Sequence, residues 1–287
     1  MEIADLLHQI IPNRWFRKLS KRYYQWQKRW HKPLDETQFK HLLETRLGIQ
    51  KGDTVAVHSS IDKLNINFSA YRLLAILLET VGEDGTLLFP SWHYVGRAEV
   101  HLRNPDFFFD VEKSPTMLGL LNELARRHPN AYRSCHPIAA MCAIGKHAEE
   151  LLSTQHLDIH PCGKESSWYK MLKYNPKIVG IGEKVVSLSF IHCVEESQYE
   201  QFPVKTLSDE PLNGRVVLKN GEEIIVPTLY NSGKVRKKNT VRFFRQHISK
   251  ESCKMFQYKG MNFFTCNPVL LLEEMTKLAN KGITVYK

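Results

Sequence analysis

A hydroxyl, an imidazole and a carboxylate follow one another in residues 187–196 with a spacing that suits proton-transfer chemistry. On a helix, Ser189 and His192 would share one face, and Glu195 or Glu196 would follow them one turn later. The carboxylate can orient the imidazole and stabilise its charge, and the imidazole can take a proton near neutral pH. Helices whose polar face meets only water carry the same pattern, so the rest of the chain must decide between the two interpretations.

The elements that would position this stretch alternate between strands and helices. An apolar run at 177–182 predicts a buried strand directly before it, and further strands are predicted at 54–57, 86–89 and 139–144. Capping residues and helical periodicity predict helices at 35–46, 71–81, 116–127, 146–153 and 166–174. Residues 93–113 have weak periodicity and are expected to form a long loop. The order predicts an α/β fold with a three-layer core, in which a central mixed sheet is flanked by helices.

The last third of the chain has a different character. Segments 215–219 and 222–226 flank Asn220-Gly221, a pair typical of a type I′ hairpin turn. A basic stretch follows, and a final helix is predicted at 269–279. The basic residues of this C-terminal subregion are Lys234, Arg236, Lys237, Lys238, Arg242 and Arg245. We expect two parts in the chain: a basic, aromatic, helical N-terminal extension at 1–34 and one compact domain at 35–287.

The composition narrows the class of protein. A formal net charge of +10 over 287 residues favours anionic partners such as a phosphorylated cofactor, a lipid surface or a nucleic acid. No apolar run is long enough to span a bilayer, and the N-terminus lacks the apolar segment of a secretory signal. The six cysteines are scattered, with no Cys-x-x-Cys pair, and there is no His-Glu-x-x-His pattern. A cytoplasmic protein with reduced thiols and no metal site is expected, and the oligomeric state is left open.

The N-terminal extension carries a basic and aromatic run at residues 14–32. Such a run could lie on anionic lipid headgroups or on a nucleic acid. It could equally form a helix whose aromatic side chains pack on the domain while its charges face water. We keep membrane-surface association as the more specific of the functional alternatives.

Three polar clusters stand at predicted strand ends or in adjoining loops, where α/β proteins usually bind ligands. They are His58-Ser59-Ser60, residues 133–137 (Arg-Ser-Cys-His-Pro) and residues 163–167 (Gly-Lys-Glu-Ser-Ser). Hydroxyl groups, turn N–H groups and an arginine are suitable donors to a phosphate or to a thioester oxygen. Each cluster taken separately is also compatible with ordinary turn and capping chemistry.

Taken together and in order, these stretches resemble the aminoglycoside 3-N-acetyltransferase family, also called the antibiotic N-acetyltransferase family. The resemblance runs from about residue 35 to residue 196, which is more than half of the chain. The motifs that carry it are Val57-His58-Ser59-Ser60, Gly85-Thr86-Leu87-Leu88 with Ser91-Trp92, Phe109-Asp110, Gly119-Leu120-Leu121-Asn122, residues 131–137, Ala143-Ile144-Gly145, Gly163 with Ser166, and residues 189–195. The family's last motif has alanine where this chain has Val194 and commonly threonine at Ser189.

The resemblance implies a cytosolic enzyme that moves an acyl group from acetyl-CoA or another acyl-CoA to an amine of a sugar, without a metal. The implied coenzyme ligands comprise one cluster at the pantetheine or thioester end and another at the phosphates. The first cluster is His58, Ser59 and Ser60, and the second is Arg133, Ser134 and His136 with Ser166 nearby.

For the reaction itself, the resemblance implies that His192 is the base that deprotonates the amine. Ser189 would donate to the thioester oxygen or the departing sulfur. Glu195 would orient His192 or bind the amine. Asp110 is a further candidate on the substrate side. A tetrahedral oxyanion needs preorganised hydrogen-bond donors, such as a hydroxyl group. The acyl group can pass directly to the amine, without an acyl-enzyme intermediate.

Two classes of substrate could supply the amine that accepts the acyl group. We expect an amino sugar linked to a nucleotide diphosphate (dTDP or UDP), as used in cell-surface polysaccharide synthesis, because the chain is basic. Its pyrophosphate would meet Lys237, Lys238 and Arg242, and Trp92 would stack on the base or sugar. An aminoglycoside, as in antibiotic resistance, is the alternative and would need an acidic pocket. A non-enzymatic nucleic-acid-binding protein is a distant third interpretation, since it would have no need of His192 or Arg133; no nucleic acid is expected as a partner.

Overall fold

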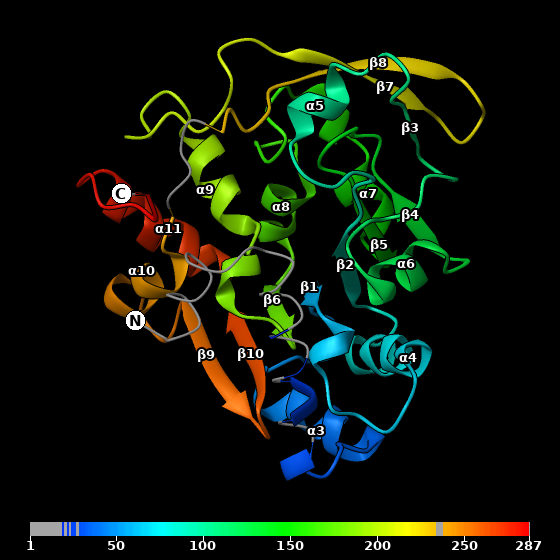
Figure 1. Ribbon diagram of the computed structural model, residues 1–287, viewed down its shortest axis with the longest axis vertical. Coiled ribbons are helices and arrows are strands. Elements are labelled where there is room, and N and C mark those ends of the chain that lie inside the picture. The colour runs from blue at the N-terminus through cyan, green and yellow to red at the C-terminus, as the bar shows by residue number, and fades with distance from the viewer. Residues whose placement is uncertain (1–18, 20–21, 23, 27–28, 234–237, 287) are drawn as a thin grey trace.

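The computed structural model describes residues 19, 22, 24–26, 29–233 and 238–286. At its centre is a seven-stranded mixed sheet with the strand order β4-β5-β2-β1-β6-β10-β9 (Figure 1). The parallel pairs are β1 with β2 and β1 with β6, and the pairings toward both edges are antiparallel. The strands are β1 (Thr54–Ser59), β2 (Thr86–Pro90), β4 (Ala131–Arg133), β5 (Met141–Gly145), β6 (Pro176–Ile181), β9 (Cys253–Tyr258) and β10 (Met261–Cys266). The predicted mixed sheet is confirmed.

Helices cover both faces of this sheet, so its central strands are mostly apolar. Val55 and Val57 of β1 pack into one core, whereas Ala56 packs into the other, as the alternation of side chains along a strand requires. The first core lies against α3 (Glu36–Thr45), α4 (Ala70–Val81) and α6 (Leu120–Arg126). The second lies against α7 (Ala148–Leu152), α8 (Ser167–Lys170), α9 (Phe190–Ser197), α10 (Thr240–His247) and α11 (Pro268–Ala279). The predicted three-layer core is therefore confirmed.

Three helices begin at capping residues that the sequence indicates. The Asp35 carboxylate accepts the N–H of Gln38 at 2.8 Å, and the Ser69 hydroxyl accepts the N–H of Arg72 at 3.1 Å. Asn267 caps α11 by accepting the N–H groups of Val269 and Leu270. Each bond satisfies a backbone donor that the first helical turn leaves unpaired, so the sequence places these helix starts closely.

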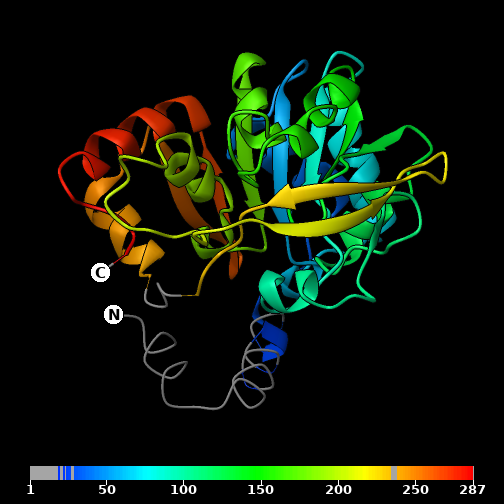
Figure 2. The ribbon, with the colours of Figure 1, turned by 90° about the horizontal axis from the view of Figure 1, so that it is seen from above.

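A second, three-stranded sheet has the order β3-β7-β8, with β3 (Phe109–Asp110), β7 (Leu212–Val217) and β8 (Glu223–Thr228). Its β7–β8 ribbon extends across one end of the molecule near α5 (Ala98–Leu102), as Figures 1 and 2 show. The hairpin is confirmed, but its turn differs from the prediction. Gly221 has a positive φ of 86°, and among the described residues other than glycine only Asn175 and Lys259 have positive φ. Because a type I′ turn needs two such residues, Asn220-Gly221 is not one.

Three further predictions need correction. The helix expected from Thr116 begins only at Leu120, because Ser114 turns its hydroxyl toward β3 and accepts the N–H of Asp110 at 2.9 Å. The expected loop at 93–113 contains both α5 and β3. The helix expected at 166–174 is shorter, since α8 is followed by a 3₁₀ turn at Met171–Lys173.

Most of the basic N-terminal run lies outside the described residues. Of those that are described, Trp26 and Trp30 are exposed, and their rings meet edge to face with centroids 5.7 Å apart. None of the helices in the described part of the chain has both the length and the apolar character to cross a membrane. Association of residues 14–32 with a membrane surface stays a prediction.

Candidate active site

A cavity of about 580 Å³ lies where β2 and β6 end and β5 begins. Trp92 follows β2, Ile138 and Ala139 precede β5, and Ser189 and His192 follow β6; all five line the cavity. Because β5 runs antiparallel to β2, the start of β5 lies beside the end of β2. The cavity therefore occupies the edge of the sheet where α/β proteins bind ligands, and its size is typical of a small-molecule site.

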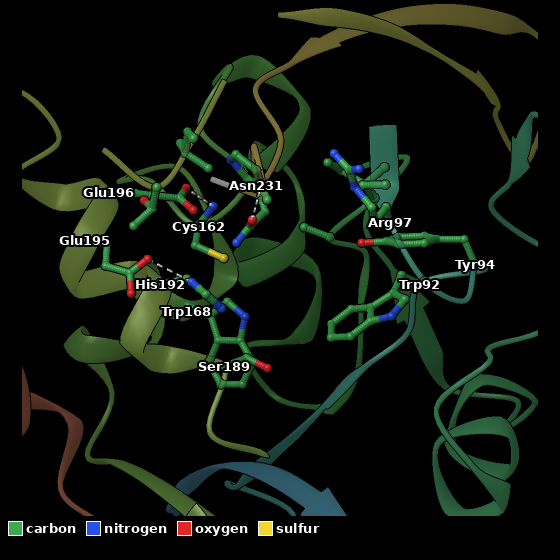
Figure 3. A pocket seen from close by; sticks show the side chains of 18 residues that line it. Trp92, Tyr94, Arg97, Cys162, Trp168, Ser189, His192, Glu195, Glu196 and Asn231 are labelled. Carbon is green, nitrogen blue, oxygen red and sulfur yellow. Dashed lines mark hydrogen bonds and ion pairs between the residues drawn. The ribbon is translucent and has the colours of Figure 1, made fainter. Parts of the chain in front are cut away.

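His192 and Glu195 form a hydrogen-bonded pair on the first turns of α9. The Nδ1 atom of His192 lies 2.9 Å from Oε2 of Glu195, and both side chains line the cavity (Figure 3). An ionised carboxylate only accepts, so Nδ1 carries the proton and Nε2 is left with its lone pair available to a substrate. Phe190, Ile191, Cys193 and Val194 are buried and hold the helix against the sheet. The arrangement suits a general base.

The carboxylate of Glu195 is engaged through both of its oxygen atoms. Its Oε1 accepts a hydrogen bond of 2.7 Å from the hydroxyl of Tyr286, near the end of the chain, while Oε2 accepts from His192. Only 2% of Glu195 is exposed. Burial, reinforced by the charge of Glu195, raises the pKa of Tyr286 well above its usual value, so the phenol remains a donor.

Glu196, the next residue, points its carboxyl into the same cavity and has a different partner. Its Oε2 accepts the backbone N–H of Cys162 at 2.6 Å. Burial raises the pKa of Glu196 well above the usual range. The cavity thus contains one carboxylate committed to His192 and a second acidic group beside it.

Aromatic side chains form much of the remaining wall. Figure 3 shows Trp92, Tyr94 and Arg97 across the cavity from His192 and Glu195. Trp168 also lines the cavity, and His58 stacks on it with ring centroids 5.6 Å apart and planes inclined by 8°. Burial lowers the pKa of His58 to about 4, so this imidazole is neutral at physiological pH. His58 therefore supports the wall from behind.

Arg133, expected at the coenzyme phosphates, makes several contacts within the fold. Its guanidinium donates to the carbonyl oxygens of Val111, Ser114 and Ser91, and it stacks over the ring of Phe109 at 4.5 Å. These bonds tie the loop before α6 to the sheet. The group is thereby engaged within the fold, and its role at the coenzyme phosphates stays a prediction.

The other expected phosphate ligands are buried as well. The Ser134 hydroxyl accepts the N–H of Met141, and Nδ1 of His136 accepts the N–H groups of Ile138 and Ala139. Ser166 caps α8 and donates to the carbonyl of Gly163 at 2.6 Å. With 1%, 0% and 0% of their surfaces exposed, Ser134, His136 and Ser166 stabilise turns instead of facing a ligand. Phosphate binding by these three residues stays a prediction.

Of the remaining residues predicted at the site, some lie at the cavity and others lie in the surrounding fold. Ser189 caps α9 without a side-chain capping bond, so its hydroxyl is available at the cavity. Ser59 and Ser60 are half-buried at the end of β1, and the Ser59 hydroxyl lies 3.5 Å from Oδ1 of Asn122. Asp110 is buried and accepts the N–H groups of Glu112 and Lys113 in a turn, and its place on the substrate side stays a prediction.

Of the basic residues expected at a pyrophosphate, Lys237 lies outside the described residues. Arg242 is exposed on α10 and donates to Gln246; it does not line the cavity. Lys238 is exposed overall, yet its backbone forms an antiparallel bridge with Tyr286. Surrounding protein atoms lower the pKa of Lys238, and attraction to Glu195 opposes that change. The two described residues therefore form no common site at the cavity.

No sequence pattern indicated several of the residues at or beside the cavity. Arg97 and Asn231 come from loops, and Trp168 follows a capping serine. Tyr286 does not itself line the cavity, but it reaches the cavity residue Glu195 across 91 positions of sequence. Only Trp168 had a local hint, because it directly follows the last of the three polar clusters. Within the part of the chain that the structure describes, no group of three or more His, Cys, Asp or Glu side chains could hold a metal ion.

Comparison with known proteins places this geometry in a family. A model of the aminoglycoside 3-N-acetyltransferase family matches residues 56–262. Aminoglycoside N(3)-acetyltransferase IX from Micromonospora chalcea is 25% identical over 176 residues, covering 57% of this chain and 62% of that protein. Aminoglycoside N(3)-acetyltransferase III from Acinetobacter baumannii is 30% identical over 162 residues, covering 52% and 56% respectively. The matching part of this chain thus spans somewhat more than half the length of these relatives.

Solved structures share the fold over a longer stretch. Aminoglycoside acetyltransferase AAC(3)-Xa superposes with a TM-score of 0.76 at 18% identity, covering 93% of this chain and 99% of that one. The AAC-IIIb binary complex with CoASH gives a TM-score of 0.73 at 18% identity, covering 88% and 98%. Since the family model spans more than half of the residues, the chain belongs to the aminoglycoside 3-N-acetyltransferase family.

Proposed function

We propose that the protein is an acetyl-CoA-dependent N-acetyltransferase that modifies an amine of a cationic amino sugar of the aminoglycoside type. The observation that carries the proposal is the His192–Glu195 pair at a cavity of small-molecule size. Two structural relatives support the coenzyme and the substrate class. AAC-IIIb was solved as a binary complex with CoASH. AAC-VIa, which has a TM-score of 0.69 at 20% identity, was solved bound to sisomicin.

The chemistry follows from the position of the base. Nε2 of His192 takes a proton from the substrate ammonium, and the freed nitrogen lone pair attacks the thioester carbonyl carbon. The proton taken from the ammonium is released to solvent, and His192 takes a second proton from the nitrogen as the C–N bond forms. The C–S bond then breaks, and this second proton passes to the departing sulfur. The Ser189 hydroxyl, which starts the same helix, is the side-chain donor proposed for the carbonyl oxygen. Glu195 stabilises the imidazolium that exists between the two proton transfers.

The charge of the cavity favours a cationic amine over a nucleotide-linked sugar. Glu195 and Glu196 both line it, although the chain as a whole is basic. An approaching ammonium favours ionisation of Glu196, whose carboxyl accepts only the Cys162 N–H among the bonds described for it. The basic residues expected to hold a pyrophosphate are not gathered here, and the comparisons agree with the aminoglycoside alternative.

The residues present also fit a coenzyme with an acyl thioester. Trp92 and Trp168 supply apolar wall for a pantetheine chain, and Arg97 is a cation on the side opposite His192. The Arg97 side chain is 54% exposed and pairs with Glu99, so a phosphate can reach it. We therefore assign to Arg97 the phosphate-binding role first expected of Arg133.

The test is a turnover assay with the purified full chain and acetyl-CoA. The acceptors are a panel of one aminoglycoside and several nucleotide-linked amino sugars; thiol release reports turnover, and mass spectrometry identifies the acetylated product. We expect acetylation of the aminoglycoside and none of the nucleotide sugars. Preferential acetylation of a nucleotide sugar would overturn the substrate assignment. The absence of thiol release with every amine would overturn the proposed activity.

A further inference from the structure

We propose that Tyr286 is a positioning residue, which makes the C-terminal segment of the chain part of the active site. Its hydroxyl donates to Oε1 of Glu195 at 2.7 Å, and Oε2 of the same carboxylate accepts from His192 at 2.9 Å. The three side chains form a continuous relay of hydrogen bonds from the end of the chain to the cavity. The catalytic part of this inference rests on the function proposed above.

The environment of Glu195 requires a second donor. Only 2% of the residue's surface is exposed, and a buried carboxylate is stable only when its oxygens are hydrogen-bonded. His192 satisfies one oxygen and Tyr286 the other. With both satisfied, the carboxylate is fixed in the orientation that selects the Nδ1–H tautomer of His192.

The fold holds Tyr286 at this place by backbone and side-chain contacts. Tyr286 forms an antiparallel bridge with Lys238, and the N–H of Asn239 donates to the carbonyl of Val285 at 3.1 Å. The hydroxyl of Thr284 accepts the N–H of Tyr286 at 3.2 Å. Val285 and Tyr286 are buried in the same core as α9, with 2% and 8% of their surfaces exposed. The position of the phenol is therefore defined by the segment that follows α11.

The arrangement also bears on which of two neighbouring glutamates serves the base. Each oxygen of Glu195 already has a side-chain donor, and the residue is buried, so Glu195 is less suited than Glu196 to bind a substrate amine. Glu196 reaches the cavity from the following position and accepts only a backbone N–H among the bonds described for it. Tyr286 thus keeps Glu195 committed to His192 and leaves recognition of the amine to other groups.

The test is Tyr286→Phe in the full chain, which removes one oxygen atom and keeps the ring. We expect kcat to fall on the order of ten- to a hundredfold, as for loss of one hydrogen bond to a charged group, with the KM for acetyl-CoA nearly unchanged. Tyr132→Phe, an exposed tyrosine on β4, is the matched control and should keep full activity.

A second readout does not depend on turnover. The Nδ1–H proton of His192, held by a buried carboxylate, should give a downfield proton NMR resonance that is absent in His192→Gln. We expect this resonance to shift or broaden in Tyr286→Phe and to be unchanged in Tyr132→Phe. An unchanged resonance and an unchanged kcat in a folded Tyr286→Phe protein would overturn the positioning role. If the wild type acetylates no amine, the resonance still tests the Tyr286–Glu195–His192 relay separately from the proposed function.

Discussion

His192 donates from Nδ1 to Oε2 of Glu195 across 2.9 Å, between two side chains one turn apart on α9. The short separation along one helix makes the pair rigid, because both residues are anchored by the same buried face. The strength of this hydrogen bond depends on the exclusion of water. Glu195 is buried, while His192 reaches the cavity. A hydrogen bond to a charged group is strong only where water does not compete for it. We therefore propose that the pair acts as one catalytic unit.

Replacement of the imidazole is the first test of that unit. His192→Ala should lower kcat about 10²–10⁴-fold, which is the usual contribution of a general base. Acetyl-CoA binding, measured by calorimetry, should survive because the side chain is needed for proton transfer. Substitution of His147, which stacks on Tyr174 away from the cavity, provides the control and should leave kcat unchanged. Full activity of His192→Ala would contradict the assignment of the base.

Glu195→Gln keeps the shape of the side chain and removes its charge. The amide can donate to Nδ1 and so favour the wrong tautomer, and it does not stabilise an imidazolium. We expect kcat to fall within the same range of about 10²–10⁴-fold. The double variant with His192→Ala should be little worse than His192→Ala alone, because the two residues act together. Measured kcat values that multiply independently would contradict the coupling.

Local sequence patterns predict much of the fold. They predict helix starts reliably, because a helix cap bonds to residues close by in the sequence. Asp35, Ser69 and Asn267 cap helices through bonds to residues two or three positions away. Turn type was less predictable. Asn220-Gly221 has the preferred sequence of a type I′ turn, yet the pair with two positive φ angles is Lys259-Gly260, between β9 and β10. There, the antiparallel pairing of β9 with β10 outweighs the preference of the turn residues.

The site shows the same division between local and long-range information. His192 and Glu195 were predictable because they are three positions apart on one helix. Tyr286 was not, since nothing near residue 195 indicates a phenol that folding brings from the end of the chain. Arg133, Ser134 and His136 stand in an ordered polar motif, but a motif does not reveal whether its donors face a ligand or the backbone. Their bonds to neighbouring carbonyl and N–H groups give them a structural role.

Arg133 permits a test that separates this role from coenzyme binding. Arg133→Lys keeps the charge but cannot reach the three carbonyl oxygens that the guanidinium now satisfies. We expect the free energy of unfolding to fall by about 1–3 kcal/mol, the cost of leaving a buried polar group unpaired. Thermal or urea unfolding measures this change, and the KM for acetyl-CoA should change little.

The matched control for Arg133 is Arg127→Lys, at an exposed arginine that pairs with Glu123. An exposed ion pair contributes about 0–1 kcal/mol, so this variant should unfold almost as the wild type does. A large rise in the KM for acetyl-CoA in Arg133→Lys, without loss of stability, would restore the phosphate-binding interpretation.

His58 predicts how stability depends on acid. Its pKa is about 4 in the folded protein, against an ordinary value of 6.5, because it is buried. Between these values the unfolded chain binds a proton that the folded chain does not, so stability falls as the pH drops from 6.5 toward 4. The contribution of His58 to this loss is roughly 3 kcal/mol.

The variant that tests this is His58→Gln, which cannot titrate. Its free energy of unfolding, measured by urea titration at several pH values, should depend less steeply on pH between 6.5 and 4 than that of the wild type. His41→Gln, at an exposed histidine of α3, should leave the wild-type slope unchanged. Identical slopes for the wild type and His58→Gln would show that His58 is protonated as readily in the folded state as in the unfolded one.

Gly180 has the most demanding steric environment of the residues that position the site. It pairs with His58 on β1 and with Phe264 on β10, and the Phe264 ring occupies the space over it. A Cβ atom at position 180 would lie 2.0 Å from a ring carbon of Phe264, so Gly180→Ala must displace that ring within the core. We expect a loss of about 1–3 kcal/mol in the free energy of unfolding.

The same geometry predicts a specific rescue. Phe264→Leu alone should destabilise the protein by leaving a cavity, but it removes the ring that collides with the new methyl group. The double variant Gly180→Ala/Phe264→Leu should therefore be more stable than the sum of the single changes predicts, by about 0.5–3 kcal/mol. Urea unfolding of the four proteins completes the cycle. Strictly additive losses would mean that the collision with Phe264 does not cause the instability of Gly180→Ala.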